Sequence, residues 1–140
     1  HTVKNTVITD KRTKKIKALG KTVPGKIHDK KLADEEDWPF PPGSQLWEDT
    51  AYQGYEPEQT TTHRPKKKPR GGELTAAEKE HNRAISKERI GIEHSIGGAK
   101  AYRIVRETLR QRKADFADLF MVIACGLHNL RLDFPVPMRA

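Results

Sequence analysis

The sequence contains a single cysteine, Cys125, so it cannot form a disulfide within the chain. This residue lies in the apolar run FMVIACGLHNL, where we expect a small, buried core side chain. A fold stapled by internal disulfides is therefore excluded, and we expect a reducing, cytoplasmic setting.

Long hydrophobic runs are also missing. The most apolar stretch, residues 116–130, is shorter than the roughly 20 residues of a membrane-spanning helix, and Arg131 and Asp133 follow it at once. The opening segment HTVKNTVITD has neither the apolar core of a signal peptide nor an initiator methionine. We expect no membrane span, and a chain that starts at an internal point of a longer protein.

The chain carries many charged residues, and positive charges are in excess. The 140 residues include 27 Lys and Arg against 19 Asp and Glu, a formal net charge of +8. This length suits one domain, residues 1–140, that buries roughly two thirds of its unfolded surface. The positive charge favours a polyanionic partner, nucleic acid before an anionic membrane, but gives no sequence specificity.

Patterns in the first half predict three strands and a short helix. Residues 2–9 are rich in β-branched side chains and KIKALGKTV alternates apolar and polar positions, which together predict an antiparallel hairpin. The segment HDKKLADEED predicts a charged helix with Asp29 as its N-cap. SQLWEDTAY predicts a short strand that contains Leu46 and Trp47 and ends near Asp49.

Two helices are predicted in the second half. Thr75 and Glu78 have the spacing of a capping box, so a helix should begin near Ala76 and run to about Gly97. An amphipathic helix is predicted over residues 113–132, where apolar residues recur at three and four positions. The recurring residues are Phe116, Leu119, Phe120, Ile123, Leu127 and Leu130. The fold class is therefore α/β, with too few strands for this amount of helix, which suggests that a strand is missing.

A basic loop, residues 63–72 with the sequence HRPKKKPRGG, precedes the long helix. It combines Arg64, four further cations and His63, which is cationic when protonated, with two prolines and two glycines, which favours an exposed, flexible loop. The four further cations are Lys66, Lys67, Lys68 and Arg70. A phosphate-contacting arm and an ordinary solvated loop both remain open at this point.

Three charged residues border the apolar stripe of the long helix. At roughly 100° per residue, Glu93 lies about 40° and Lys100 about 20° from Arg89. Ile85, Ile92 and Ile96 fall within about 60° on the other side of Arg89. A helix carboxylate beside the core and a strand-end carboxylate, Asp49, can together bind a hard cation such as Mg²⁺, which supports phosphodiester chemistry. Two alternatives remain: Arg89 and Glu93 can form an ordinary ion pair worth about 0.3 kcal/mol, and Asp49 can cap a turn.

Several short segments occur in order along the chain: HTVKN, GKIHD, WEDTAYQGY, KKKPRGGELT, NRAISKERIGIEHSIGGAK and IACGLHNLR. In this order they resemble the carboxyl-terminal half of bacterial insertion-sequence transposases of the DDE superfamily, the "five"-type group, over nearly the whole chain. The most specific element is Arg, three residues, Glu, six residues, Lys, which Arg89, Glu93 and Lys100 match. An Asp-x-x-Tyr strand end precedes it and is matched by Asp49 and Tyr52.

The resemblance implies part of an RNase H-like fold, a mixed sheet with an antiparallel hairpin packed by helices. It also implies a catalytic Asp-Asp-Glu triad in which Asp49 is the second aspartate and Glu93 the glutamate, both binding Mg²⁺ or Mn²⁺. The first aspartate precedes the equivalent of HTVKN in that family, so this chain is expected to lack the first strand and to be inactive alone. Asp10 is a poor substitute, because its strand is the second in the family pattern.

The resemblance further implies DNA as the partner. The expected DNA-binding residues are Arg89, Lys100, Tyr52, Lys66, Lys67, Lys68 and Arg70. Within a complete enzyme the chain would serve metal-dependent phosphodiester hydrolysis and strand transfer at insertion-sequence ends. That enzyme would act on transposon ends and target DNA as a homo-oligomer, in the bacterial cytoplasm and at the nucleoid when bound. The alternative is a non-catalytic basic DNA-binding or assembly module derived from a truncated transposase.

Overall fold

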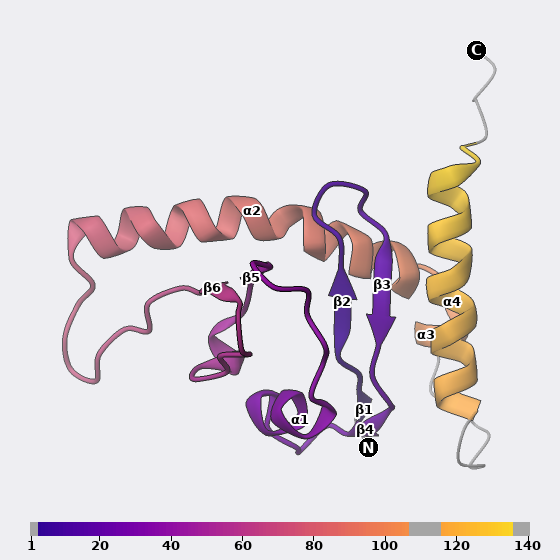
Figure 1. Ribbon diagram of the computed structural model, residues 1–140, viewed down its shortest axis with the longest axis horizontal. Coiled ribbons are helices and arrows are strands. Elements are labelled where there is room, and N and C mark those ends of the chain that lie inside the picture. Colours follow the sequence, from indigo (N-terminus) through magenta and orange to yellow (C-terminus); the bar gives the residue numbers. More distant parts are fainter. Residues whose placement is uncertain (1–2, 107–115, 136–140) are drawn as a thin grey trace. The chain divides into compact units, whose positions relative to one another are not determined.

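The computed structural model describes residues 3–106 and 116–135 (Figure 1). The chain divides into two compact units: the first unit comprises residues 3–24 and the chain from Gly91 onward, and the second unit comprises residues 25–90. The predicted mixed α/β class, with an antiparallel hairpin and helices, is confirmed. The elements are β1 (Val3–Lys4), β2 (Val7–Thr9), β3 (Ile16–Leu19), β4 (Val23–Pro24), α1 (Asp29–Glu36), β5 (Gln45–Trp47), the 3₁₀ turn η1 (Thr50–Tyr52), β6 (Thr61–His63), α2 (Ala76–Lys100), α3 (Arg103–Arg106) and α4 (Phe116–Asp133).

The first unit is built on the predicted hairpin. β2 pairs antiparallel with β3, and β1 pairs antiparallel with β4. The strand expected over residues 2–9 is interrupted at Asn5, whose side chain donates to the Gly20 carbonyl at 3.0 Å and to the Thr22 hydroxyl at 2.8 Å. The side-chain amide thus replaces ladder hydrogen bonds where the two strand pairs meet.

The hairpin turn is closed by Asp10. Its carboxylate accepts hydrogen bonds from the Thr13 amide at 2.6 Å and from the Thr13 hydroxyl at 2.9 Å. These bonds, the amide bond first, hold the pKa of Asp10 below its ordinary value. Lys14 takes the left-handed conformation, with φ +62°, that returns the chain to β3. Asp10 therefore has a structural role in this turn.

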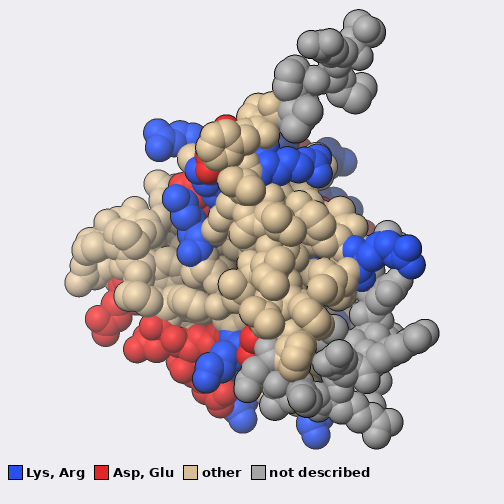
Figure 2. Space-filling view, turned by 90° about the vertical axis from the view of Figure 1, so that its right-hand side faces the viewer, with Lys and Arg blue, Asp and Glu red and all other residues tan. Residues whose placement is uncertain are grey.

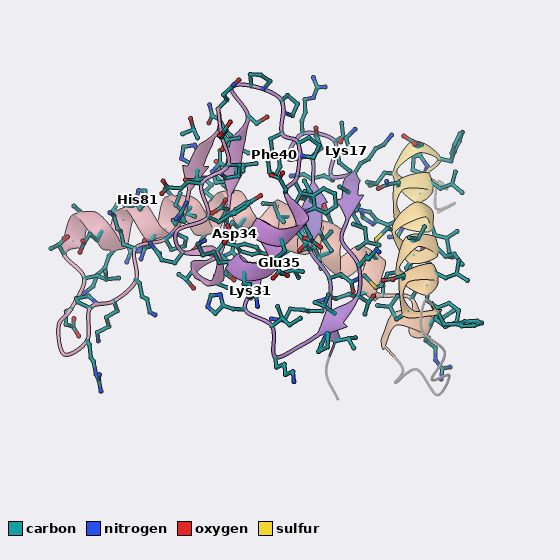
Figure 3. The ribbon with its side chains drawn as sticks, turned by 60° about the horizontal axis from the view of Figure 1, so that its bottom comes forward. Lys17, Lys31, Asp34, Glu35, Phe40 and His81 are labelled. Carbon is teal, nitrogen blue, oxygen red and sulfur yellow. The ribbon has the colours of Figure 1, made fainter. Side chains whose placement is uncertain are left out.

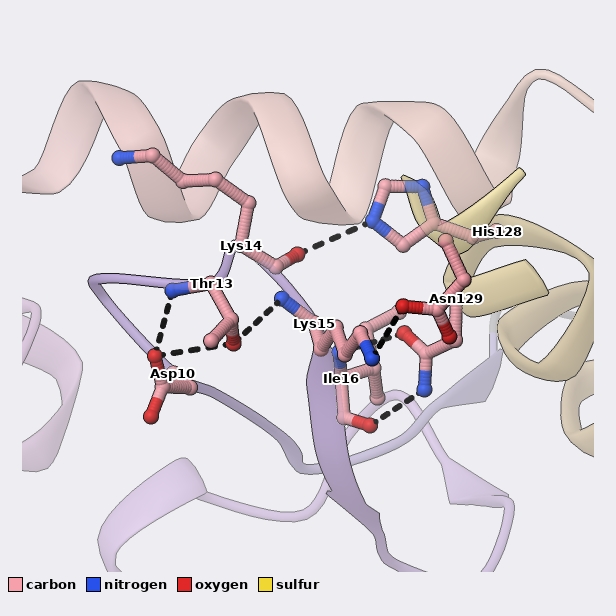
Figure 4. A network of polar contacts seen from close by, with 8 residues as sticks. Asp10, Thr13, Lys14, Lys15, Ile16, His128 and Asn129 are labelled. Atoms are coloured by element: carbon pink, nitrogen blue, oxygen red, sulfur yellow. Dashed lines mark hydrogen bonds and ion pairs between the residues drawn. The ribbon is translucent and has the colours of Figure 1, made fainter. Parts of the chain in front are cut away.

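The polar side of α4 is hydrogen-bonded to the hairpin (Figure 4). Asn129 accepts from the amide of Ile16 and donates to its carbonyl, both at 2.8 Å. His128 lies 3.1 Å from the carbonyl oxygen of Lys14. Since both peptide groups of Ile16 point away from β2, Asn129 occupies the place that a neighbouring strand would take along β3.

The core of the first unit is small. Ile16, Ala99 and Cys125 are buried together, and Val7, Leu19 and Met121 pack against them. The burial of Cys125 confirms the expectation from the sequence. Gly98 continues α2 instead of ending it, and a Cβ atom there would lie 2.4 Å from Nδ1 of His128. Glycine is thus required for this contact between α2 and α4.

Large apolar side chains of α4, and that of Phe134 directly after it, remain exposed, with exposed fractions between 40% and 71%. The surface of α4 that faces the viewer in Figure 2 is accordingly almost uncharged. The side chains concerned are Leu119, Val122, Ile123, Leu127, Leu130, Leu132 and Phe134. The predicted helix and its apolar repeat are present from Phe116 on, and residues 113–115 lie outside the described residues. The buried residues of this helix are the small Ala124 and Cys125.

The second unit contains α1, the parallel pair of β5 and β6, and the first part of α2. The predicted helix α1 is present, but Asp29 is its first helical residue and His28 is the N-cap, without a side-chain capping bond. The expectation that Asp29 is the N-cap is therefore wrong by one residue, because His28 keeps the extended backbone that an N-cap requires. β5 has the position expected from the sequence, and its pairing with β6 is parallel.

The carboxyl ends of β5 and β6 carry a buried ion pair. The register places Trp47 beside His63, whose rings stack at 4.8 Å, so the next residues, Glu48 and Arg64, also lie side by side. Arg64 Nε lies 3.5 Å from a Glu48 carboxylate oxygen, and the side chains are only 12% and 8% exposed. Burial raises the pKa of Glu48 to about 7 despite the opposing effect of Arg64. Arg64 also donates to the carbonyl of Tyr55 at 2.6 Å.

Helix α2 begins where the sequence predicts. The Thr75 hydroxyl accepts from the Glu78 amide at 3.2 Å and the Glu78 carboxylate accepts from the Thr75 amide at 2.9 Å, which completes a capping box. The helix runs to Lys100, three residues beyond the expected end at Gly97. No described helix has the length and apolar character needed to cross a membrane.

We predict that Asn129→Ala lowers the free energy of unfolding by about 2 kcal/mol, because both peptide groups of Ile16 lose their partner in a partly buried place. The measurement is urea unfolding of the 140-residue chain followed by circular dichroism. Val122→Ala, an exposed change on the same helix, is the matched control and should stay within about 0.5 kcal/mol. Equal losses in the two variants would contradict the role given to Asn129.

We predict that Arg64→Met at pH 8 lowers the free energy of unfolding by about 3 kcal/mol, because it leaves the Glu48 carboxylate buried without its cation. Adding Glu48→Gln should restore part of this loss, since an amide is cheaper to bury than an unpaired carboxylate. The same unfolding measurement on both variants tests this. A double variant less stable than Arg64→Met would show that the ion pair is not the cause.

Candidate catalytic carboxylates and basic loop

Asp49 lies two residues after β5, at the start of the 3₁₀ turn η1. One carboxylate oxygen accepts from the Thr50 amide at 2.5 Å and from the Thr50 hydroxyl at 3.1 Å. The side chain is half exposed. Asp49 therefore caps the turn, as one alternative from the sequence predicted. Capping uses only one of its two carboxylate oxygens.

The second oxygen of Asp49 faces α2. Arg89 on this helix donates to it at 3.3 Å, and the arginine side chain is 21% exposed. Both residues belong to the second unit. The contact holds the strand-end carboxylate at the turn of α2 that contains Arg89. The spacing of residues in the sequence did not predict this contact.

Glu93 and Lys100 follow Arg89 on the same continuous helix. Both side chains are exposed, whereas Ile85, Ser95 and Ala99, on the adjoining face of the helix, are buried. The predicted order, with charges along the border of the buried stripe, is thus present. Because residues four apart on a helix are neighbours, Glu93 lies one turn beyond Arg89 on the same side of α2.

Tyr52 ends η1 and is half-buried. Its ring lies 6.4 Å from that of Tyr55, and its amide donates to the Asp49 carbonyl at 3.0 Å. Burial, the first cause, and the nearby Glu48 raise the pKa of Tyr55 to about 12. The Asp-x-x-Tyr spacing therefore closes the turn that begins at Asp49.

The candidate metal ligands have the right donor chemistry, because carboxylate oxygens are what Mg²⁺ prefers. Within the described part of the chain, however, no three or more His, Cys, Asp or Glu side chains gather as a metal site. Asp49 belongs to the second unit and Glu93 to the first. These two residues supply an incomplete ligand set.

The cations of the basic loop differ in their exposure to solvent. Arg64, which the sequence groups with the exposed cations, is only 12% exposed and has a structural role, because it pairs with Glu48. Lys66, Lys67, Lys68 and Arg70 are partly or fully exposed. Asn82 on α2 forms two hydrogen bonds with the backbone of Lys66, at 2.7 and 3.0 Å. Sequence reasoning missed Asn82, since a single polar residue in a charged helix carries no recognisable pattern.

The model of the DDE superfamily endonuclease family matches residues 1–129. One similar protein is the probable transposase for insertion sequence element IS702 of Microchaete diplosiphon, which is 31% identical over 132 residues. The alignment covers 94% of this chain and 47% of the relative, so the chain spans about half the length of the curated protein that it matches. No solved structure matches the chain. With the family model covering nearly the whole sequence, the chain belongs to the DDE superfamily of endonucleases.

Proposed function

We propose that this chain is the carboxyl-terminal part of the catalytic domain of an insertion-sequence DNA transposase with an RNase H-like fold. Asp49 and Glu93 are its catalytic carboxylates. Family membership and the similarity to the IS702 transposase support this function. The hairpin, the parallel pair β5–β6 and the long helix α2 are the elements that support the fold.

The contact between Asp49 and Arg89 is the observation that carries the proposal. It attaches a strand-end carboxylate to α2 at 3.3 Å, and Glu93 follows Arg89 by one turn on that helix. Asp49 is thereby bonded to the helix that also carries Glu93. The geometry of the contact makes Arg89 a positioning residue for Asp49.

Asp49 and Glu93 would hold Mg²⁺ or Mn²⁺ together with a further acid supplied from outside the described residues. An ion held there would supply activation of a water or hydroxyl and stabilisation of the departing oxygen of the phosphodiester. The protein's own residues have separate tasks. The Thr50 amide and Arg89 orient the Asp49 carboxylate, and Lys100 and the basic loop attract the DNA phosphates.

A non-catalytic DNA-binding or assembly module is the second candidate. The observation that favours it is the incomplete ligand set among the described residues, combined with the net charge of +8. Such a module would keep DNA affinity and lose nothing when a carboxylate is neutralised. The two candidates therefore differ in the effect of one substitution.

We predict that Glu93→Gln lowers Mg²⁺-dependent cleavage of a DNA end by at least about a hundredfold, in the product of the complete reading frame that contains this sequence. The measurement is strand cleavage of a labelled duplex on a denaturing gel. DNA affinity should stay within about twofold, because a carboxylate contributes no attraction to phosphate.

The matched control is Glu35→Gln, which removes the same charge from an exposed side chain on α1 (Figure 3). It should leave cleavage unchanged. A complete protein that binds DNA but does not cleave it would establish the binding module instead.

A second experiment tests whether Asp49 and Glu93 share an ion. With Fe²⁺ in place of Mg²⁺, ascorbate and peroxide should cut the chain near both residue 49 and residue 93 if they do.

A further inference from the structure

We propose that the basic loop is a DNA-binding arm held against α2 by Asn82, and that three cations of α2 extend its phosphate-binding surface. The arm is defined as residues 66–70. The α2 cations are Lys79, Arg83 and Lys87. This inference rests on the proposed function for the presence of DNA, and it assigns residues that the catalytic site does not use.

Asn82 pairs with both peptide groups of one arm residue. Its side-chain oxygen accepts from the Lys66 amide at 2.7 Å, and its side-chain nitrogen donates to the Lys66 carbonyl at 3.0 Å. The neighbouring His81 lies with Nε2 3.2 Å from the Arg64 carbonyl oxygen. The arm thus leaves β6 along α2 instead of extending freely into solvent, although no helix or strand forms over residues 64–75.

The residue before the arm is held by several contacts, and an acid after it pairs with two lysines. Before it, Arg64 is buried at the end of β6 and bonded to Glu48, Tyr55 and Thr62. After it, Glu73 lies 3.4 Å from Lys68 and 3.5 Å from Lys79. Glu73 thus lies between the arm and the first turn of α2, although its side chain is exposed and water screens both pairs.

The α2 cations form one row. Lys79, Arg83 and Lys87 are separated by four residues each, and all are exposed. On a helix this spacing places them along one side at steps of about 6 Å. Together with Asn82 they border a shallow depression whose apolar part comes from Leu74 and Ile90.

The charge balance of this surface favours a polyanion. The arm and the row contribute seven cations, and the acids paired with them are Glu73 and Glu80. Glu80 lies 3.4 Å from Arg83 but is itself exposed, so water screens the pair. Cations on a rigid helix and a tethered arm suit the phosphate backbone of duplex DNA, which neutralises them without any base contact.

Asn82 increases affinity by ordering the arm before DNA binds. A free arm must lose its conformational freedom on binding, whereas a tethered one has already lost much of it. Replacing Asn82 by alanine leaves the helix intact, since alanine is the better helix former. It also leaves the charge unchanged, so any effect on DNA binding comes from the position of the arm.

The test measures fluorescence anisotropy of a labelled 30-base-pair duplex with the 140-residue chain, in EDTA and at several salt concentrations. Asn82→Ala should weaken binding by about threefold to tenfold. Lys87→Gln should lower the slope of log K against log salt by about 0.9, the value for one lost phosphate contact. Lys31→Gln, an exposed lysine on the acidic helix α1 (Figure 3), is the matched control and should change neither quantity.

Two further readouts separate a positioning role from a general structural one. Trypsin should cut after Lys66 or Lys67 several times faster in Asn82→Ala, while the unfolding midpoint stays the same. In a chain that carries Lys66→Gln, Lys67→Gln and Lys68→Gln, adding Asn82→Ala should have no further effect on DNA affinity. The arm and its tether would then act as one unit.

Each outcome decides a separate point. Salt-dependent binding with no change in Asn82→Ala, in affinity or in trypsin cleavage, would overturn the tethered arm. An unchanged salt slope in Lys87→Gln would remove the row on α2 from the surface. A wild-type chain without affinity for duplex DNA would overturn the whole inference. Since no step requires a metal ion, loss of the catalytic proposal alone would leave these results unaffected.

Discussion

Pairing between a helix asparagine and the two peptide groups of a single residue is the interaction that recurs in both units of this protein. Asn129 pairs with both peptide groups of Ile16, and Asn82 does the same with Lys66. In each case a peptide whose N–H and C=O have no strand beside them needs a partner, and an amide side chain offers one donor and one acceptor at the right separation. At β3 the pairing gives a short strand a defined edge without a longer sheet, and at Lys66 it holds the backbone of a loop.

The same pairing decides which side of α4 is buried. The apolar repeat of this helix predicts an amphipathic element, and by hydrophobicity alone its large aliphatic side chains should face inward. Instead Asn129 and His128 bind the hairpin, and the small Ala124 and Cys125 pack beneath them. Leu119 and Leu130 are left about half exposed. The hydrogen bonds of Asn129 and His128 therefore determine which face of the helix is turned inward. The spacing of apolar residues in the sequence gives no information about these bonds.

Much of the fold was predictable wherever the deciding interaction is local. The capping box of Thr75 and Glu78 marks the start of α2, and alternation marks the hairpin, because both involve residues close in sequence. For the candidate site, the sequence predicted only the spacing of Arg89, Glu93 and Lys100 and the position of Asp49 after a strand. That Arg89 binds Asp49 across 40 positions, and that Arg64 is buried while its neighbours in the loop are not, depends on tertiary contacts. No pattern within a short window contains that information.

Parallel pairing of β5 and β6 explains why charge gathers at one edge of the second unit. Parallel strands end at the same edge, so the residues after them, Glu48, Asp49 and Arg64, are brought together by the register alone. Arg64 pairs with Glu48, which is buried. Asp49 pairs with a different arginine, Arg89 of α2. Two adjacent acids thus have different environments: one has its pKa raised by burial, and the other is exposed, bonded to an amide and a guanidinium. Only the second has the accessibility that metal binding requires, and this difference distinguishes Asp49 from Glu48 as the candidate ligand.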